Sequence, residues 1–342
     1  MNKVFLVAGG SGGHLFPALS LFEQLKDYDT LILTDKRTEK YLKRLGMKYR
    51  KIITAKLKIN FFLVFNLLKL FLSILENIAI IIKRKPDIII GFGGYTSIPT
   101  IIAAKILNKK IIIHEQNAVM GKTNRMLSKI ADIVAVTFPK TKFAPKNSVY
   151  TGIPLRKKKK ISNFKTKKKR IFIVGGSQGA KIFSEIFPEV LKNFDKSLLK
   201  KLIIVQQARE DDLEEIKKKY QSLKVAHKIE KCFYNIYEQY YNADLIICRC
   251  GASTLAEIEI FSKPCLLFPL PSSMNNHQYY NAKEFEKNNS CFIFDENNLS
   301  VKSLSEKIEN LIFLGKKKKK LYSVKNNIQK ISFIDLMKRV AN

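Results

Sequence analysis

The chain has few acidic residues, few cysteines and none of the common nucleotide-binding fingerprints. Its 29 Asp and Glu residues stand against 62 Lys and Arg residues, a formal net charge of +33 over 342 residues. The cysteines are Cys232, Cys248, Cys250, Cys265 and Cys291. Because none form a Cys-x-x-Cys pair, reduced thiols fit better than a disulfide framework. The chain contains neither the Gly-x-Gly-x-x-Gly spacing of NAD-binding proteins nor the Walker spacing of ATP-binding proteins, so the motifs indicate neither nucleotide as a ligand.

The basic surplus is concentrated in runs at residues 157–160, 167–170 and 316–320. These runs contain no interleaved aromatic residues and match no DNA- or RNA-binding signature, so no nucleic-acid partner is expected. Two explanations stay open for the surplus: a solvated lysine-rich surface, or attraction to an anionic membrane.

The length and the 46% hydrophobic content predict two domains with full cores. The sequence runs from Lys3 directly into an apolar strand-like segment, which leaves no room for an export signal. We therefore expect a cytosolic protein.

Three glycine clusters each follow an apolar strand-like run. They are Gly9-Gly10-Ser11-Gly12-Gly13, Gly91-Phe92-Gly93-Gly94 and Gly175-Gly176-Ser177-Gln178-Gly179. A strand that turns through glycines into a helix leaves backbone N–H groups that attract phosphate oxygens. The first and third clusters share one pattern and indicate two nucleotide-fold domains, whereas an ordinary tight turn stays possible for the second.

Apolar runs and helical patterns alternate along the whole chain. Strands are expected at 3–8, 30–34, 87–91, 110–114, 132–136, 148–151, 170–174, 201–206, 224–229, 244–248, 265–269 and 291–294. Helices are expected at 15–26, 38–45, 61–83, 98–107, 121–130, 180–193, 210–220, 235–241, 253–261, 278–287 and 301–314. This order predicts an α/β protein with two parallel sheets covered by helices on both faces. The carboxyl ends of the strands, in a cleft between the domains, are the expected ligand site.

The longest apolar stretch, residues 61–82, is flanked by lysines and is long enough to span a membrane. Spanning is disfavoured because Lys69 and Glu76 would each cost about 2.5–3.5 kcal/mol at the bilayer centre. Its polar residues recur every three to four positions, which collects them on one helical stripe. A helix lying in an anionic membrane surface and an amphipathic core helix both remain open.

Seven motifs in order resemble one family. They are Gly9-Gly10-Ser11-Gly12-Gly13-His14-x-x-Pro17-Ala18, Gly91-Phe92-Gly93-Gly94-Tyr95, His114-Glu115-Gln116-Asn117, Gly152-Ile153-Pro154-Leu155-Arg156, Gly175-Gly176-Ser177-Gln178-Gly179-Ala180, Cys248-Arg249-Cys250-Gly251-Ala252 and Asn276-His277-Gln278-x-x-Asn281-Ala282. Together they resemble the MurG family of bacterial N-acetylglucosaminyltransferases, over nearly the whole chain.

The resemblance implies a two-domain (GT-B) glycosyltransferase that moves N-acetylglucosamine, with inversion, from its UDP carrier to the C4 hydroxyl of a muramyl peptide on undecaprenyl pyrophosphate. It implies an acceptor and membrane-associating domain at 1–155, a UDP-sugar domain at 156–324, and a C-terminal helix at about 325–342 that packs back on the first. The enzyme would be peripheral on the cytoplasmic face of the bacterial inner membrane, and would act in peptidoglycan synthesis.

No cofactor and no metal ion is expected. Asp27-Tyr28-Asp29 has the spelling of a metal-binding pair, but it precedes a strand instead of following one beside a glycine turn. Helix termini and basic groups can supply the electrostatic stabilisation instead.

The resemblance also assigns roles to residues. His14 would be the catalytic base, although a histidine that only hydrogen-bonds the loop or a phosphate remains an alternative. Ser11, Gly12, Gly13 and Asn117 would form the acceptor side. The donor residues would be Ser177 with Arg156 or Arg249 on the diphosphate, Glu257 on the ribose, Phe233 beside the uracil, Gln278 and Asn281 on the transferred sugar, and the helix start at Ala252, Ser253, Thr254, Leu255 and Ala256.

Two residues depart from the family pattern. Cys250 replaces a serine, which makes a side-chain hydrogen bond there doubtful, and Ile153 replaces an asparagine.

Two other functions stay open: a UDP-N-acetylglucosamine 2-epimerase of the same fold, which needs no lipid acceptor, and a non-catalytic protein that binds nucleic acid or acidic lipid.

Overall fold

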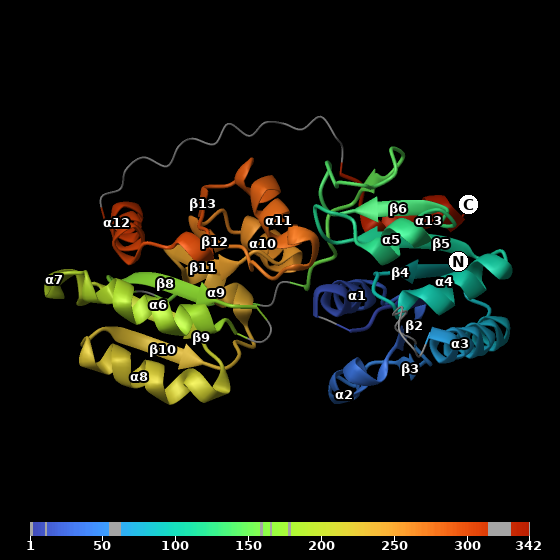
Figure 1. Cartoon of the computed structure of the whole chain (residues 1–342), viewed down its shortest axis with the longest axis horizontal. Coiled ribbons are helices and arrows are strands. Elements are labelled where there is room, and N and C mark those ends of the chain that lie inside the picture. The colour runs from blue at the N-terminus through green and yellow to red at the C-terminus, as the bar shows by residue number, and fades with distance from the viewer. Residues whose placement is uncertain are drawn as a thin grey trace. The chain divides into compact units, whose positions relative to one another are not determined.

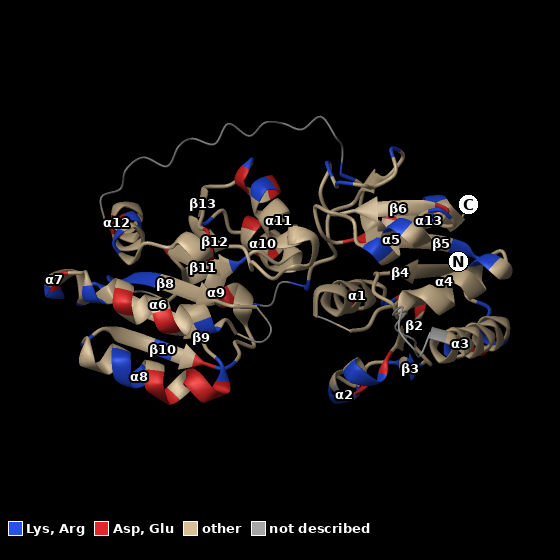
Figure 2. Ribbon diagram, viewed as in Figure 1, with Lys and Arg blue, Asp and Glu red and all other residues tan. Residues whose placement is uncertain are grey.

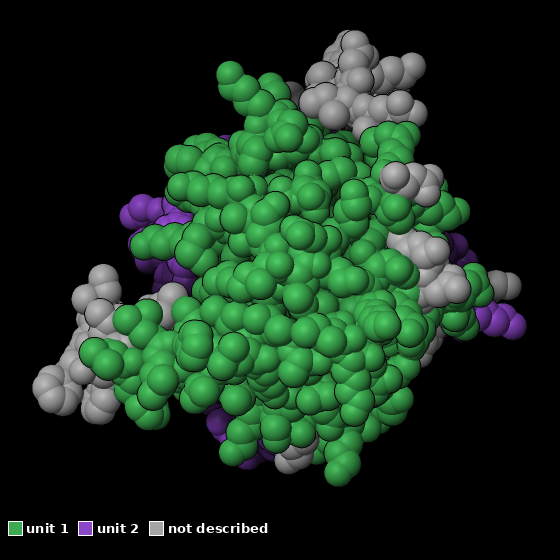
Figure 3. All heavy atoms as spheres, turned by 90° about the vertical axis from the view of Figure 1, so that its right-hand side faces the viewer, with its two compact units in different colours: residues 1–157, 326–342 green, residues 158–325 purple. Residues whose placement is uncertain are grey.

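A computed structural model describes residues 3–10, 12–54, 63–157, 160–164, 166–176, 179–313 and 330–341. The chain divides into two compact units (Figures 1 and 3). Unit 1 comprises residues 1–157 and 326–342, and is green in Figure 3; unit 2 comprises residues 158–325 and is purple. The last helix of the chain therefore belongs to the same unit as the first strand.

Unit 1 is built on a parallel sheet with strand order β3-β2-β1-β4-β5-β6-β7. Its strands are β1 (Lys3–Val7), β2 (Asp29–Thr34), β3 (Tyr49–Lys51), β4 (Ile88–Gly91), β5 (Lys110–Glu115), β6 (Ile133–Val136) and β7 (Val149–Tyr150). Its helices are α1 (Gly12–Gln24), α2 (Lys36–Arg44), α3 (Leu63–Arg84), α4 (Ser97–Ile106), α5 (Lys122–Leu127) and α13 (Phe333–Ala341).

Helices cover both faces of the unit 1 sheet because successive strand residues point to opposite sides. Val4 and Leu6 of β1 pack with α1 and α13, whereas Phe5 and Val7 pack with α3, α4 and α5. Strands buried on both faces read as continuous apolar runs, as Ile88–Ile90 does. Figure 1 shows α13, in red, beside the green β6.

Two residues of the polar stripe of helix α3 face the protein, whereas Lys69 of the same stripe is exposed. Ser73 and Asn77 are fully buried. The Ser73 hydroxyl donates to the Ile53 carbonyl, and the Asn77 Oδ1 accepts from the Thr100 hydroxyl at 2.7 Å. Eight large apolar side chains of α3 are 46–79% exposed, namely Val64, Phe65, Leu67, Leu68, Phe71, Leu72, Leu75 and Ile82. By length and composition α3 could cross a membrane, and only 22% of its apolar window is buried.

Unit 2 is built on a second parallel sheet, with strand order β10-β9-β8-β11-β12-β13. Its strands are β8 (Lys169–Val174), β9 (Leu202–Gln207), β10 (Ala226–Glu230), β11 (Leu245–Arg249), β12 (Cys265–Phe268) and β13 (Cys291–Ile293). Its helices are α6 (Lys181–Lys192), α7 (Lys196–Leu199), α8 (Leu213–Ser222), α9 (Ile236–Asn242), α10 (Ala252–Glu259), α11 (His277–Glu286) and α12 (Val301–Ile312). Short 3-10 turns lie at Glu210–Asp212, Met274–Asn276 and Glu296–Asn298.

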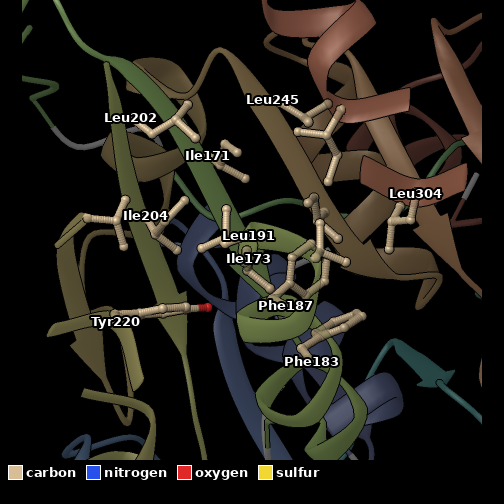
Figure 4. Close-up of a cluster of buried hydrophobic side chains, with 14 of the residues drawn as sticks. Ile171, Ile173, Phe183, Phe187, Leu191, Leu202, Ile204, Tyr220, Leu245 and Leu304 are labelled. Carbon is tan, nitrogen blue, oxygen red and sulfur yellow. The ribbon is translucent and has the colours of Figure 1, made fainter. Parts of the chain in front are cut away.

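Both faces of the unit 2 sheet are also covered. Ile171 and Ile173 of β8 pack with α6, α8 and α12, as Figure 4 shows, while Phe172 packs with α9, α10 and α11. The Tyr220 hydroxyl, red in Figure 4, donates to the Gln206 side chain at 2.5 Å. The hydrogen bond compensates for burying that hydroxyl.

The prediction of two parallel α/β sheets is confirmed. Two short elements were not predicted: β3, with three residues, and α7, with four. Helix α2 starts earlier than expected because Asp35 caps it, its side chain accepting from the Arg37 backbone. Charged residues gather on the helices and loops (Figure 2), where α8 is blue and red in succession and α3 is mostly tan.

Candidate active site

Two of the glycine clusters lie where the strand order of the unit 1 sheet reverses. In unit 1 the order reverses between β1 and its neighbour β4. Open parallel sheets bind ligands beyond the carboxyl ends of the strands at such a reversal. The cluster Gly9–Gly13 follows β1, and Gly91–Gly94 begins at the end of β4, so both flank this point. Gly12 and Gly13 form the first turn of α1; Ser11 lies outside the described residues.

His14 lies at the first turn of α1 and contacts both neighbouring motifs. Its Nδ1 is 2.9 Å from the Oε1 of Gln116. Gly94 has a φ of +72°, and a Cβ there would lie 3.4 Å from the His14 Cδ2. The imidazole thus lies against the second glycine cluster and is bonded to a side chain from the loop after β5, not only to its own loop.

Gln116 links His14 to a second histidine. The Gln116 Nε2 lies 3.0 Å from the Nδ1 of His114, and the Nε2 of His114 lies 2.9 Å from the Gly152 carbonyl. Burial lowers the pKa of His114 to about 4, and the charge of His14 acts in the same direction, while the hydrogen bond to Gly152 opposes both. The sequence named His114 and Gln116 only as motif residues, so their connection to His14 was missed.

Asn117 is held by the buried carboxylate of Glu115. That carboxylate accepts from the backbone N–H groups of Asn117 at 2.9 Å and Gly121 at 3.1 Å, and from the Asn124 side chain at 2.8 Å. Glu115 therefore organises the loop that presents Asn117. No separate role was predicted for this glutamate.

Arg156 lies along α1. Its guanidinium is 5.2 Å from the centre of the Phe16 ring, and the neighbouring Leu155 carbonyl accepts from the Gln24 side chain at 2.8 Å. Arg156 is exposed. It therefore contacts the helix that carries His14.

Unit 2 repeats the arrangement. Its strand order reverses between β8 and its neighbour β11, and the cluster Gly175–Gly179 follows β8. The turn is tight: a Cβ on Gly175 would lie 2.2 Å from the Ala180 backbone nitrogen. Ser177 and Gln178 lie outside the described residues.

Helix α10 starts on the other side of this reversal. It begins at Ala252 after Gly251, without a side-chain cap. The Ser253 hydroxyl is buried and has no hydrogen-bond partner among the described residues. Thr254, Leu255 and Ala256 continue the helix. Uncapped N–H groups and an unused hydroxyl at a helix start are suited to binding an anion.

Gln278 and Asn281 reach this turn from α11. The Gln278 Oε1 accepts from the backbone N–H groups of Cys250 at 3.0 Å and Leu270 at 3.1 Å. The Asn281 Nδ2 donates to the Cys250 carbonyl at 3.1 Å, and Asn281 is fully buried. These bonds use the backbone of Cys250, so they are independent of whether its side chain is cysteine or serine.

Three other predicted residues lie around the same sheet edge. Glu257 is 5% exposed on α10. Phe233 follows β10, and its ring lies edge-on to Phe172 of β8 with the centres 5.4 Å apart. Arg249, at the end of β11, is 8% exposed and pairs with Glu296. Its charge is therefore already partly neutralised.

Two hollows in the described parts of the units lie elsewhere. One is lined by Lys167–Lys169 and Asp244, and the other by Asp87 and Asn108–Lys110. Both lie at the amino ends of strands, the opposite edge from the glycine turns, so they do not match where parallel sheets bind substrates. Among the described residues, no group of three His, Cys, Asp or Glu side chains is placed to hold a metal ion.

Known proteins resemble both halves of the chain. The N-terminal domain of glycosyltransferase family 28 matches residues 4–136, and its C-terminal domain matches residues 170–340. A protein of Rickettsia bellii named UDP-N-acetylglucosamine--N-acetylmuramyl-(pentapeptide) pyrophosphoryl-undecaprenol N-acetylglucosamine transferase is 40% identical, with 91% of each chain covered. A protein of the same name from Rickettsia canadensis matches equally well.

A solved structure agrees with these relatives. The crystal structure of Acinetobacter baumannii MurG shares 29% identity with this chain, with a TM-score of 0.76 and 91% of each chain covered. The similarity therefore extends over both units.

Proposed function

We propose that this chain, which belongs to the MurG family within glycosyltransferase family 28, transfers N-acetylglucosamine from UDP-N-acetylglucosamine to undecaprenyl-pyrophosphoryl-N-acetylmuramoyl peptide. The observation that carries this proposal is the 40% identity, over 91% of the chain, to curated proteins named for that reaction. The product is the lipid-linked disaccharide from which peptidoglycan is made. Neither a cofactor nor a metal ion is part of the proposal.

Unit 2 holds the donor in this proposal. The glycine turn after β8 and the uncapped start of α10 offer N–H groups to the diphosphate, with the unpartnered Ser253 hydroxyl beside them. Glu257 binds the ribose and Phe233 borders the uracil. Gln278 uses its Oε1 on two backbone groups, so its amide NH₂ is the group left to donate to the transferred sugar.

Unit 1 supplies the base. His14 takes the proton of the C4 hydroxyl of the muramyl sugar, and the oxygen attacks the anomeric carbon of N-acetylglucosamine as the bond to UDP breaks. The electron pair of that bond leaves with the diphosphate. Asn117 and the Gly12–Gly13 turn position the acceptor. Arg156 offers its charge beside α1, the helix that carries His14. A positioned base contributes about 10²–10⁴-fold to such a reaction.

The outward face of α3 is the proposed membrane contact. Eight apolar side chains of the helix are 46–79% exposed, whereas Ser73 and Asn77 are buried and bonded inside the protein. Lys83 and Arg84 end the helix, and each adds about 1 kcal/mol of attraction near an anionic bilayer. We therefore place the enzyme peripherally on the cytoplasmic face of the inner membrane, where α3 lies in the headgroup region.

The test is incubation with radiolabelled UDP-N-acetylglucosamine and a lipid-linked muramyl peptide, with and without a chelator. Transfer of label to lipid that a chelator does not reduce supports the proposal and its metal independence. Release of free epimerised sugar without lipid labelling would indicate a 2-epimerase. Salt-sensitive polyanion binding without UDP release would indicate a non-catalytic binding protein.

A further inference from the structure

A continuous row of hydrogen bonds crosses the carboxyl edge of the unit 1 sheet and ends at His14. It runs from the Gly152 carbonyl to His114 of β5, then to the Gln116 side chain, then to the His14 Nδ1, with steps of 2.9, 3.0 and 2.9 Å. No hydrogen bond reaches the other ring nitrogen of His14, Nε2, from the described residues. The row thus engages one side of the imidazole only.

Two backbone carbonyls determine the direction of every bond in this row, because a carbonyl can only accept. The Gly152 carbonyl lies 2.9 Å from the His114 Nε2, so that nitrogen carries the proton. Neutral His114 then has a lone pair on Nδ1, which must accept from the Gln116 NH₂. The carbonyl of His114 accepts from the same NH₂ at 3.0 Å, which independently gives the amide the same orientation.

The orientation of the amide decides the protonation of His14. With both N–H bonds of Gln116 used on His114, its Oε1 faces the His14 Nδ1. An amide oxygen only accepts, so Nδ1 of His14 must donate. The neutral imidazole then has its lone pair on Nε2.

We propose that Gln116 and His114 are positioning residues that hold His14 with its proton on Nδ1 and its Nε2 lone pair available to the acceptor hydroxyl. This inference rests on the proposed function, since it concerns the base of that reaction. It explains why the His114-Glu115-Gln116-Asn117 motif contains the Gln116 amide and the buried His114: they position His14 and do not need to contact substrate.

The surroundings of His114 keep the row in this state. His114 is fully buried, and its ring packs edge-on to Phe333 of α13 at 5.5 Å and against Phe92 at 5.6 Å. Burial lowers its pKa to about 4, so it is neutral at pH 7 and keeps the lone pair that Gln116 requires. Phe333 comes from the end of the chain, so α13 helps to enclose the row.

The proton balance of the transfer step agrees with this arrangement. The O–H bond of the acceptor breaks and its proton moves to the His14 Nε2, while the oxygen bonds to the anomeric carbon and the bond to UDP breaks. His14 becomes an imidazolium that still donates from Nδ1 to the Gln116 oxygen. That hydrogen bond to a charged donor is stronger than the neutral one and stabilises the charge as it forms.

The first test needs no variant. The tautomers of the four histidines can be assigned by ¹⁵N NMR of the full chain labelled at histidine, at pH 8, above the usual imidazole pKa of about 6.5. His227 and His277 are internal references, because their Nδ1 atoms lie 3.0 and 2.8 Å from backbone carbonyls. We expect Nδ1–H for His14 and Nε2–H for His114. The Nε2–H tautomer at His14 would overturn the inference.

The second test removes the amide. In Gln116→Met we expect His14 to lose its single tautomer and kcat to fall about 10- to 100-fold, a part of what a positioned base supplies. The KM for UDP-N-acetylglucosamine should stay unchanged. Gln239→Met, which removes a buried amide that accepts from Arg170 at the amino end of β8 in unit 2, is the matched control and should keep the wild-type kcat.

The outcomes separate this inference from the proposed function. A wild-type chain that labels no lipid would overturn the proposed function and the catalytic role of the row together. An active wild type whose Gln116→Met variant keeps both its kcat and its His14 tautomer would overturn the inference alone. The signals of His227 and His277 report on unit 2. Denaturant unfolding of the variant beside the wild type shows whether unit 1, which contains Gln116, is folded.

Discussion

The two strand-order reversals have the same topology but are lined by different kinds of groups. At β1 and β4 of unit 1, side chains converge from several elements: His14 from α1, Gln116 and Asn117 from the loop after β5. At β8 and β11 of unit 2, backbone groups dominate, and Gln278 and Asn281 use their side chains to hold the backbone of Cys250. The comparison teaches that one fold can bring side chains together at the reversal in one unit and hold backbone groups in place there in the other.

The largest expected effect is on the unit 1 side. His14→Ala should lower kcat by about 10²–10⁴-fold, because it removes the proposed base, and should leave the KM for UDP-N-acetylglucosamine unchanged. Steady-state kinetics with the lipid-linked acceptor measures both. A variant with the wild-type kcat would show that the side chains of unit 1 do not carry the chemistry.

His114 should make the stability of unit 1 depend on pH. Its folded pKa of about 4 lies below the unfolded value of 6.5, so folding favours the neutral form. Its contribution is fully present above pH 6.5 and is lost as the pH falls toward 4, by about 3 kcal/mol in total. Denaturant unfolding at several pH values should give a flatter curve for His114→Gln. Parallel curves for the two proteins would contradict the assignment.

On the unit 2 side we expect an effect on binding instead of chemistry. Glu257→Ala should weaken UDP binding about 10- to 100-fold, the range for a lost hydrogen bond to a charged group, with a smaller change in kcat. Calorimetric titration with UDP measures the affinity, and steady-state kinetics measures the change in kcat. If kcat fell and the UDP affinity did not change, the division of roles between the units would be wrong.

The smallest effect concerns the membrane. Phe65→Glu should weaken binding to vesicles of anionic lipid by about tenfold, because it removes apolar contact from α3 and adds like charge. Phe143→Glu is the control: Phe143 is also 64% exposed in unit 1 but lies in the segment between β6 and β7 and not on α3. Vesicle sedimentation measures both. Equal losses in the two variants would show that α3 is not the contact.

Much of the fold was predictable because its signals are local. Apolar runs such as Ile88–Ile90 and Leu245–Ile247 gave the strands, and the glycine clusters marked the turns after β1 and β8. The three residues of β3 carried too short a pattern to be predicted. Of the candidate site, the residue types were predictable from motifs, but the partners of those residues were not.

The sequence alone determined the two parallel sheets, their glycine turns and the polar stripe of α3, because periodicity and backbone conformation depend on neighbours a few residues apart. Only the tertiary structure decided that Ser73 and Asn77 of this stripe face inward, since this depends on Ile53 and Thr100 being there to bond them. It also decided the row from Gly152 to His14, because hydrogen bonds between residues far apart in the chain exist only once the sheet has assembled.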